Sequence, residues 1–151
     1  MKLLGKENTT RPDPVARKAD GFTYPRVSPE ALPYWEGCLQ NELRYQRCGD
    51  CSEPVFHPRA VCPYCLSDNL SWECSEGVGE IYSFSVQYVA LYPEREGNLP
   101  RAVGIVALKE GYHMFTELEI PVGSELRVGQ KVRVYFDRVA DDLALPKFRI
   151  D

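Results

Sequence analysis

Two short cysteine pairs constrain the fold of this chain more than any other feature of its sequence. Cys48 and Cys51 form one C-x2-C pair, and Cys62 and Cys65 form a second pair after a gap of ten residues. Each pair presents two thiolates from one turn, and two such turns supply the four ligands of a tetrahedral metal site. The spacing therefore predicts a four-thiolate metal centre in a small ribbon with a short hairpin between the two turns.

Zinc is the metal that this ligand set favours, and its expected role is structural. Four thiolates fill the coordination sphere, whereas catalytic zinc keeps one position open for water or substrate. The thiolates also carry excess negative charge, and Arg44, Arg47 and Arg59 lie close enough in sequence to offset it. Iron binds the same four thiolates in rubredoxin-like electron carriers, so that class of protein remains an alternative.

The other cysteines and histidines are expected to have different roles. His57 lies between the two pairs and is an alternative ligand, but four cysteines already in register favour packing or hydrogen bonding for it. Cys38 and Cys74 have no C-x2-C partner and are expected to be small buried side chains.

The charge distribution argues against nucleic-acid binding. The 151 residues carry 18 Lys and Arg against 22 Asp and Glu, a formal net charge of −4. Positive charge is in excess only in residues 1–26, although a nucleic-acid binder depends on phosphate neutralisation for its affinity. No apolar run approaches the ~20 residues of a membrane-spanning helix, and the N-terminus lacks the apolar core of a secretory signal. We therefore expect a cytoplasmic protein with reduced cysteines.

The chain divides into three predicted parts. Residues 1–27 are polar, contain several prolines and show no hydrophobic periodicity, so they are expected to form an extended arm. Residues 28–75 contain a short helix and the metal ribbon. Residues 76–151 form a β-domain that begins at a glycine-containing segment, residues 77–79.

The expected helix lies within residues 28–40, where proline suits a first helical turn because it loses no hydrogen bond there. The helical spacing places Trp35, Cys38 and Leu39 on one face and turns Tyr34 partly away. This face either packs on the ribbon or the barrel, or it docks on a partner protein. The ribbon strands are predicted at residues 43–47 and 55–57.

Residues 76–151 are predicted to form a five-stranded barrel of the OB-fold type. Alternating apolar residues indicate strands, and a tight turn joins the second and third strands in a hairpin. In the first strand, the alternation places Tyr82, Phe84, Val86 and Tyr88 on one face. The expected strands are residues 81–88, 102–108, 113–118, 131–136 and 147–150. Five strands without a long helix between them fit a small closed barrel, which makes the protein mainly β.

Several motifs together carry a family resemblance over about residues 30–151. They are Tyr-Trp-Glu-Gly at 34–37, Leu-x-Tyr-Gln-Arg-Cys-x-x-Cys at 43–51, Phe-His-Pro-Arg-x-x-Cys-Pro-x-Cys at 56–65, Gly-Glu-Ile-Tyr-Ser-Phe-Ser-Val at 79–86 and Ala-Leu-Pro-Lys-Phe at 144–148. In these motifs the chain resembles a family that pairs a rubredoxin-like zinc ribbon with an acyl-CoA-associated OB-fold, long catalogued as a domain of unknown function.

The resemblance implies a non-catalytic accessory subunit that binds structural Zn²⁺. Members of this family assemble with thiolase-type enzymes or with hydratases that act on acyl-CoA thioesters. There the ribbon and barrel contact the catalytic subunit and help to form the CoA or acyl-CoA pocket, in some members during the degradation of aromatic compounds such as toluene. The residues agree, because a thiolase needs an activated cysteine and histidines as acid and base, and this chain offers only His57 and His113.

Four residues are candidates for contact with CoA or with the partner subunit. Tyr34 and Trp35 offer aromatic surface, and Arg59 and Arg101 suit phosphate groups. The turn-rich loop 92–100 has the length of a binding loop. For each, core packing or solvation is the competing interpretation. A single-stranded nucleic-acid-binding OB-fold also remains an alternative, because such barrels bind bases through exposed aromatic rings.

Overall fold

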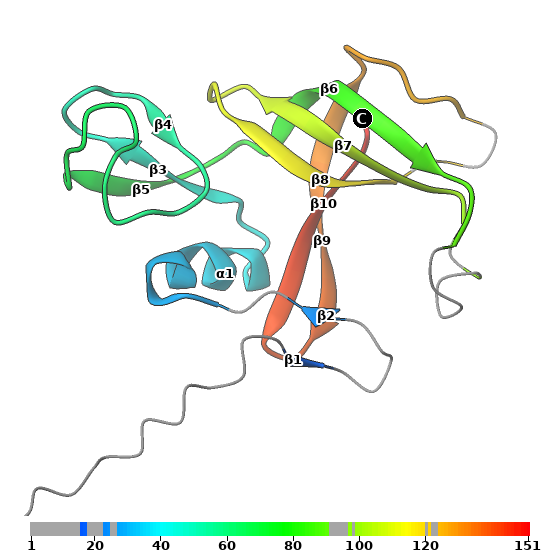
Figure 1. Cartoon of the computed structure of the whole chain (residues 1–151), viewed down its shortest axis with the longest axis horizontal. Helices are drawn as coiled ribbons and strands as arrows, with labels where there is room; N and C mark the ends of the chain where they lie inside the picture. The colour runs from blue at the N-terminus through cyan, green and yellow to red at the C-terminus, as the bar shows by residue number, and fades with distance from the viewer. Residues whose placement is uncertain are drawn as a thin grey trace, which may run out of the picture.

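The computed structural model describes residues 16–17, 23–24, 27–90, 97, 99–119, 121 and 124–151 of the chain. Its elements, in chain order, are β1 (Ala16–Arg17), β2 (Thr23–Tyr24), η1 (Pro29–Ala31), α1 (Leu32–Leu39), β3 (Arg44–Cys48), β4 (Pro54–Val55), β5 (Leu70–Cys74), β6 (Val78–Gln87), β7 (Arg101–Leu108), β8 (His113–Glu119), β9 (Lys131–Ala140) and β10 (Leu143–Ile150). A three-stranded ribbon lies beside a closed five-stranded barrel, and α1 packs against β3, β9 and β10 (Figure 1). The predicted mainly β architecture with a short N-terminal helix is confirmed.

Two predicted segments fall largely outside the described residues. Of the arm, residues 1–27, the structure describes residue 27 and the antiparallel pair β1 and β2. Of the loop 92–100, it describes only residues 97, 99 and 100. Among the described residues, no helix is long and apolar enough to cross a membrane.

The helix α1 turns a different face inward from the one that the sequence predicts. Tyr34 and Cys38, one helical turn apart, are both buried, whereas Trp35 and Leu39 are half-buried. Tyr34 is therefore not turned away from the core, and the predicted orientation was wrong by about one residue around the helix. Gly37 allows this close packing, because a Cβ there would lie only 2.8 Å from a side-chain carbon of β3.

The ribbon has the strand order β4-β3-β5, with both pairs antiparallel. β3 lies within one residue of the predicted strand, while β4 is shorter than predicted and ends at Val55. β5 was not predicted, although its apolar residues Leu70, Trp72 and Cys74 alternate with polar ones. β3 pairs with β5 along its whole length, which places the first cysteine pair at the end of the ribbon.

The prediction of five barrel strands is confirmed, although β9 and β10 are each four residues longer than predicted, and the strands close in the order β10-β8-β7-β6-β9. All pairs are antiparallel except β10 and β8, as expected for an OB-fold barrel. β7 and β8 form the predicted hairpin, and Gly111 in its turn has a φ of +96° that favours glycine. The barrel core includes Ile81, Val106, Val132 and Phe148, each at most 1% exposed.

A β-bulge in β6 overturns the predicted single face of that strand. Ile81 lies opposite Val106 and Ser83 lies opposite Ile105, so Tyr82 is an extra residue between two register positions. An extra residue moves every later side chain to the other side of the sheet. Tyr82 is exposed on the outer face, whereas Phe84 pairs with a buried glycine of β7 and is itself 36% exposed.

An aromatic cluster joins the ribbon, the helix and the barrel. Tyr112, in the turn between β7 and β8, stacks on Phe56 of the ribbon with ring centroids 4.9 Å apart. Its ring also lies 5.1 Å from Tyr45 of β3, and Tyr34 of α1 meets Phe56 edge-on at 5.7 Å. These buried rings belong to the same hydrophobic cluster as the barrel core. The ribbon and the barrel are thus parts of one packed unit.

Candidate metal centre

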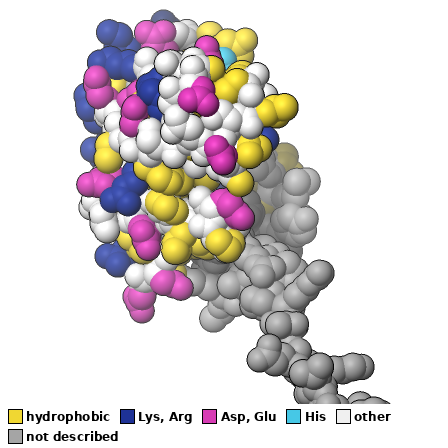
Figure 2. Space-filling model, turned by 90° about the vertical axis from the view of Figure 1, so that its left-hand side faces the viewer, with side chains coloured by type: hydrophobic (Ala, Val, Ile, Leu, Met, Phe, Trp, Pro, Cys, Tyr) yellow, Lys and Arg dark blue, Asp and Glu magenta, His cyan; other side chains and the backbone are white. Residues whose placement is uncertain are grey.

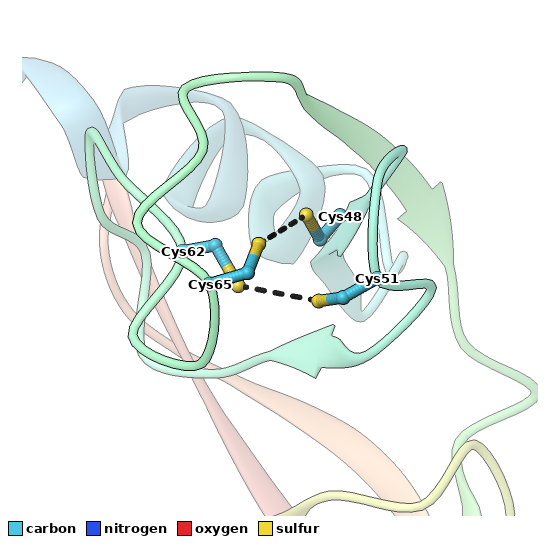
Figure 3. Close-up of side chains that lie close together, drawn as sticks. All are labelled: Cys48, Cys51, Cys62 and Cys65. Carbon is cyan, nitrogen blue, oxygen red and sulfur yellow. Dashed lines mark hydrogen bonds between the residues drawn. The ribbon is translucent and has the colours of Figure 1, made fainter.

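The four predicted cysteine ligands converge on one point. The Sγ atoms of Cys48, Cys51, Cys62 and Cys65 all lie within 4.8 Å of one another (Figure 3). The Sγ atoms of Cys48 and Cys65 are 3.5 Å apart, and those of Cys51 and Cys62 are 3.6 Å apart. A tetrahedral zinc ion with Zn–S bonds of about 2.3 Å requires S–S separations of about 3.8 Å. The donor set therefore fits a single Zn²⁺ ion.

The two cysteine turns have the same backbone structure. In the first, the N–H of Ser52 donates to the carbonyl of Cys48 at 2.9 Å, and the N–H of Cys48 donates to the carbonyl of Glu53. In the second, the N–H of Leu66 donates to the carbonyl of Cys62, also at 2.9 Å. Each hydrogen bond closes a turn whose two thiols point to the same side. The sequence repeat C-x2-C thus becomes a structural repeat.

Backbone groups, rather than arginines, supply positive potential to the sulfur atoms. The backbone N–H of Cys51, followed by that of Asp50, lowers the pKa of the Cys48 thiol to about 7. The N–H of Tyr64 points at Sγ of Cys62 at 3.4 Å. Such N–H groups favour the thiolate, which is the form that binds metal.

The predicted compensation by Arg44 and Arg47 was wrong. Arg44 is bound to Glu42 at 2.6 Å, and Arg47 is bound to Glu73 at 2.8 Å. These carboxylates, from the ribbon and from the segment leading into it, attract the guanidinium groups away from the cysteines. The side chain of Arg59 is exposed and forms no hydrogen bond or ion pair among the described residues.

A side-chain bridge that the sequence analysis missed ties the two turns together. Asp50 accepts hydrogen bonds from Oγ of Ser67 at 2.6 Å and from Nδ2 of Asn69 at 3.0 Å. These bonds hold the pKa of Asp50 below its ordinary value. The sequence does contain the residues of this bridge, an acidic residue inside the first C-x2-C pair and polar residues just after the second pair. Pairing them requires knowing that the two turns face each other.

The other metal-binding side chains lie outside the cysteine cluster. His57 is exposed and packs beside Phe56, with ring centroids 4.7 Å apart. Cys38 is fully buried as predicted, and burial raises the pKa of its thiol to about 12. Cys74 is exposed beside Glu42, so the expectation of burial was wrong for this residue. It lies at the end of β5, an edge strand of the ribbon.

The candidate contact residues come from three different elements. Tyr34 is only 7% exposed and belongs to the core, and Trp35 packs edge-on against it at 5.0 Å. Arg101, on β7, is bound to Glu117 at 2.6 Å. Of the four candidates, Arg59 alone has an exposed side chain, in the segment between the two cysteine pairs. Of these four, Arg59 is the cation without an ion pair among the described residues, and contact of the four with CoA or a partner stays a prediction.

Two family matches cover most of the described chain. Residues 35–71 match the family described as "ChsH2, rubredoxin-like zinc ribbon domain", and residues 72–137 match "ChsH2, C-terminal OB-fold domain". The chain belongs to this zinc-ribbon and OB-fold family. The predicted family and the predicted structural zinc are confirmed, and the ribbon match favours zinc over the iron of an electron carrier.

Curated relatives of this family include subunits of hydratases. The chain is 28% identical over 95% of its length to a probable enoyl-CoA hydratase alpha subunit of Thermomonospora curvata. It is 29% identical over 78% of its length to the 3-oxo-4,17-pregnadiene-20-carboxyl-CoA hydratase alpha subunit of Mycobacterium tuberculosis. The matches span 41% and 37% of those two relatives. A DUF35 domain-containing scaffold protein of Methanocaldococcus jannaschii is 28% identical over 64% of the chain and 68% of that protein.

Two solved structures share the fold. The chain superposes with a TM-score of 0.74 and 27% identity on a chain of the "Ltp2-ChsH2(DUF35) aldolase", covering 84% of this chain and 98% of that one. A DUF35 protein from Sulfolobus solfataricus gives a TM-score of 0.61 at 14% identity, covering 83% of this chain and 87% of that one. The second likeness supports the fold alone.

Proposed function

We propose that this chain is a non-catalytic accessory subunit of an enzyme complex that acts on acyl-CoA thioesters. The observation that carries the proposal is the superposition on almost the whole of one chain in the Ltp2–ChsH2(DUF35) aldolase, whose description names two components. The hydratase alpha subunits and the scaffold protein among its relatives support the same role. In this role the zinc holds the ribbon together, and the chemistry belongs to the partner subunit.

The reactive groups of the chain support a role without catalysis of its own. The sequence contains two histidines, His57 and His113, and both are exposed. Among the described residues, no hydrogen bond joins either histidine to a cysteine. Burial raises the pKa of Cys38, which disfavours the nucleophilic thiolate, and the cysteine cluster is a closed ligand set.

We further propose that the catalytic partner is a thiolase-type enzyme and that the ribbon completes its CoA pocket. Arg59 supports this assignment, because an exposed guanidinium without a carboxylate partner suits a phosphate of CoA. Trp35, half-buried on α1, is the aromatic side chain of the candidate set that retains surface. This chain resembles the small subunit of benzoylsuccinyl-CoA thiolase, an enzyme of toluene degradation, in size and layout. Benzoylsuccinyl-CoA is therefore the first thioester to assay with the complex.

Nucleic-acid binding is the weaker proposal. On the ribbon side of the molecule, acidic and basic side chains are interspersed with hydrophobic ones (Figure 2). A single-strand binder needs a positively charged groove that follows the phosphate backbone. The mixed charge of this face favours contact with protein.

Affinity purification of the tagged, zinc-loaded chain from its native extract tests the proposed function. We expect a stoichiometric catalytic subunit that acts on an acyl-CoA, identified by mass spectrometry and then assayed with CoA thioesters. A chain that retains its zinc but brings down no such enzyme would count against an accessory role. A partner that is a hydratase or an aldolase would support the accessory role and overturn the thiolase assignment.

A further inference from the structure

An exposed apolar patch covers the outer face of β6, β7 and β8. Phe115 is 65% exposed and Tyr82 is 59% exposed. Phe115 lies directly opposite Ile105 in the hairpin of β7 and β8. Tyr82 reaches across β7, where the small side chain of Ala107 lies, and packs against His113 of β8 with ring centroids 4.7 Å apart. We call these five residues the outer patch.

The register of β6 decides which of its side chains join the outer patch. Without the extra residue, the inward alternation of Ile81 would continue two residues later, and Tyr82 would be an ordinary outward residue with Phe84 beside it. With the bulge, Phe84 takes the register of the inward row, where it is 36% exposed, and both Tyr82 and Ser83 take outward positions. The patch is thus set by the register of the sheet and does not depend on a mobile loop.

Two other parts of the barrel are covered by the chain itself. The helix α1 packs on β9 and β10, and the turn between β7 and β8 packs on the ribbon. The second and third strands of an OB-fold, here β7 and β8, form the face that usually binds ligands. Among the described residues, this is where large aromatic rings remain exposed on a regular sheet surface.

Acidic and basic residues around the outer patch balance one another, which favours a protein over a polyanion as its ligand. Glu80 lies opposite Lys131 on β9, and Glu119 lies opposite Arg149 on β10. The remaining carboxylate of this face, Glu117, is held in ion pairs with bases on β7 and β10. A polyanion such as a nucleic acid or CoA finds no excess of positive charge here. An aromatic centre with a mixed-charge rim is the composition of a protein–protein interface.

We infer that the outer patch docks the catalytic subunit of the acyl-CoA complex, through an apolar surface of that subunit with a near-neutral polar rim. This inference rests on the proposed function and names the surface by which it operates. Tyr82 and Phe115 are the anchors, because aromatic side chains at the centre of an interface carry most of its binding energy.

The test compares two aromatic rings that are equally exposed. Phe115→Ser removes the centre of the outer patch, and Tyr64→Ser removes a ring from the second cysteine turn; both rings are 65% exposed in the free chain. Each zinc-loaded variant is titrated against the purified catalytic subunit that accompanies the wild-type chain. We expect the dissociation constant to rise about tenfold or more for Phe115→Ser and to stay within about twofold for Tyr64→Ser. Zinc content and far-UV circular dichroism show that both variants are folded.

Each other outcome overturns the inference in a different way. If Phe115→Ser binds as tightly as the wild type, the docking surface lies elsewhere, and the proposed function stands. If the wild-type chain binds no catalytic subunit, the proposed function fails as well. If the substitution instead abolishes self-association in sedimentation velocity, or binding of an oligothymidylate, the patch serves a second copy of the chain or a single strand.

Discussion

Two residues of the ribbon adopt a backbone conformation that favours glycine. Ser52 and Leu66 each follow the second cysteine of a pair, and each has a φ of +64°. A residue with a Cβ loses about 1 kcal/mol or more in this region. Leu66 is also 78% exposed, so hydrophobic burial does not offset this cost. The geometry of the metal site is therefore obtained against the local preference of the residue at this position.

We expect Leu66→Gly to raise the free energy of unfolding of the zinc-loaded chain by up to about 1 kcal/mol. Urea denaturation at constant free zinc measures this change. Ser52→Gly is expected to shift stability in the same direction. Asp68→Gly is the control, because Asp68 is exposed and has no positive φ. Glycine at this position only raises the conformational entropy of the unfolded chain, so the variant should be less stable than the wild type. A loss of stability in Leu66→Gly equal to that of the control would contradict the explanation.

A second prediction at the residue scale separates ligands from other cysteines. Cys62→Ser removes one thiolate of the cluster, and we expect the zinc content of the purified chain to fall from about one ion per chain toward zero. Cys74→Ser is the matched control, since its thiol lies outside the cluster. Zinc is measured by mass spectrometry of the native protein. Equal zinc content in both variants would refute the assignment of the four ligands.

A row of ion pairs links four strands of the barrel. Glu117 of β8 is bound to Arg101 of β7 at 2.6 Å and to Lys147 of β10 at 3.5 Å, and Lys147 is bound to Asp137 of β9 at 2.7 Å. Burial alone would raise the pKa of Glu117, but the hydrogen bond from Arg101 and the charge of Lys147 hold this pKa below its ordinary value. The row contributes stability only while Glu117 is ionised.

We expect Glu117→Gln to lower the free energy of unfolding by about 1 kcal/mol at pH 7. A folded-state pKa below the unfolded value means that the stabilisation is present above about pH 4.3 and is lost as the pH falls through the folded value. The difference between wild type and variant should therefore shrink as the pH falls below about 4.3. Urea titrations at pH 7, 5 and 3 measure it. Glu125→Gln, at an exposed residue 3.6 Å from Arg127, should be neutral throughout.

The elements show which parts of the fold are readable from sequence. Strands with one buried face, such as β7 and β8, carry a period of two that predicts them within about one residue. β5 also carries this period in Leu70, Trp72 and Cys74, but it was missed because it is only five residues long and both its apolar and its polar positions are partly exposed. The bulge at Tyr82 was also missed, since an extra residue leaves no local signal and appears only when two strands are paired.

In the candidate site, too, the residues whose geometry is local in sequence were predictable, and those that depend on packing between elements were not. The four cysteine ligands were predicted because both members of each pair lie within one turn, so their spacing encodes their geometry. The exposure of the candidate contact residues was not readable from sequence, because it depends on how the helix, the ribbon and the barrel pack. Tyr34 illustrates this, because the packing of three elements buries its ring.

At the scale of the whole molecule, Tyr112 makes the ribbon and the barrel one unit. We expect Tyr112→Ala to lower the free energy of unfolding by about 3 kcal/mol, because it leaves a cavity among the rings of Phe56 and Tyr45. Tyr112→Phe keeps the ring and should change stability by about 1 kcal/mol or less. Chelation of zinc should alter the near-UV circular dichroism of the wild type more than that of Tyr112→Ala. An equal response in both would show that the joint does not couple the two parts.

The position of the hairpin of β7 and β8 has a consequence for the order of events in the cell. Its turn is packed into the ribbon through Tyr112, and three residues further on its strand presents Phe115 to the outside. In a newly made chain without zinc, no metal ion holds the ribbon against which this turn packs. Under the proposed function, metal delivery would then precede assembly with the catalytic subunit, and a shortage of zinc would appear first as unassembled subunits rather than as a defective reaction.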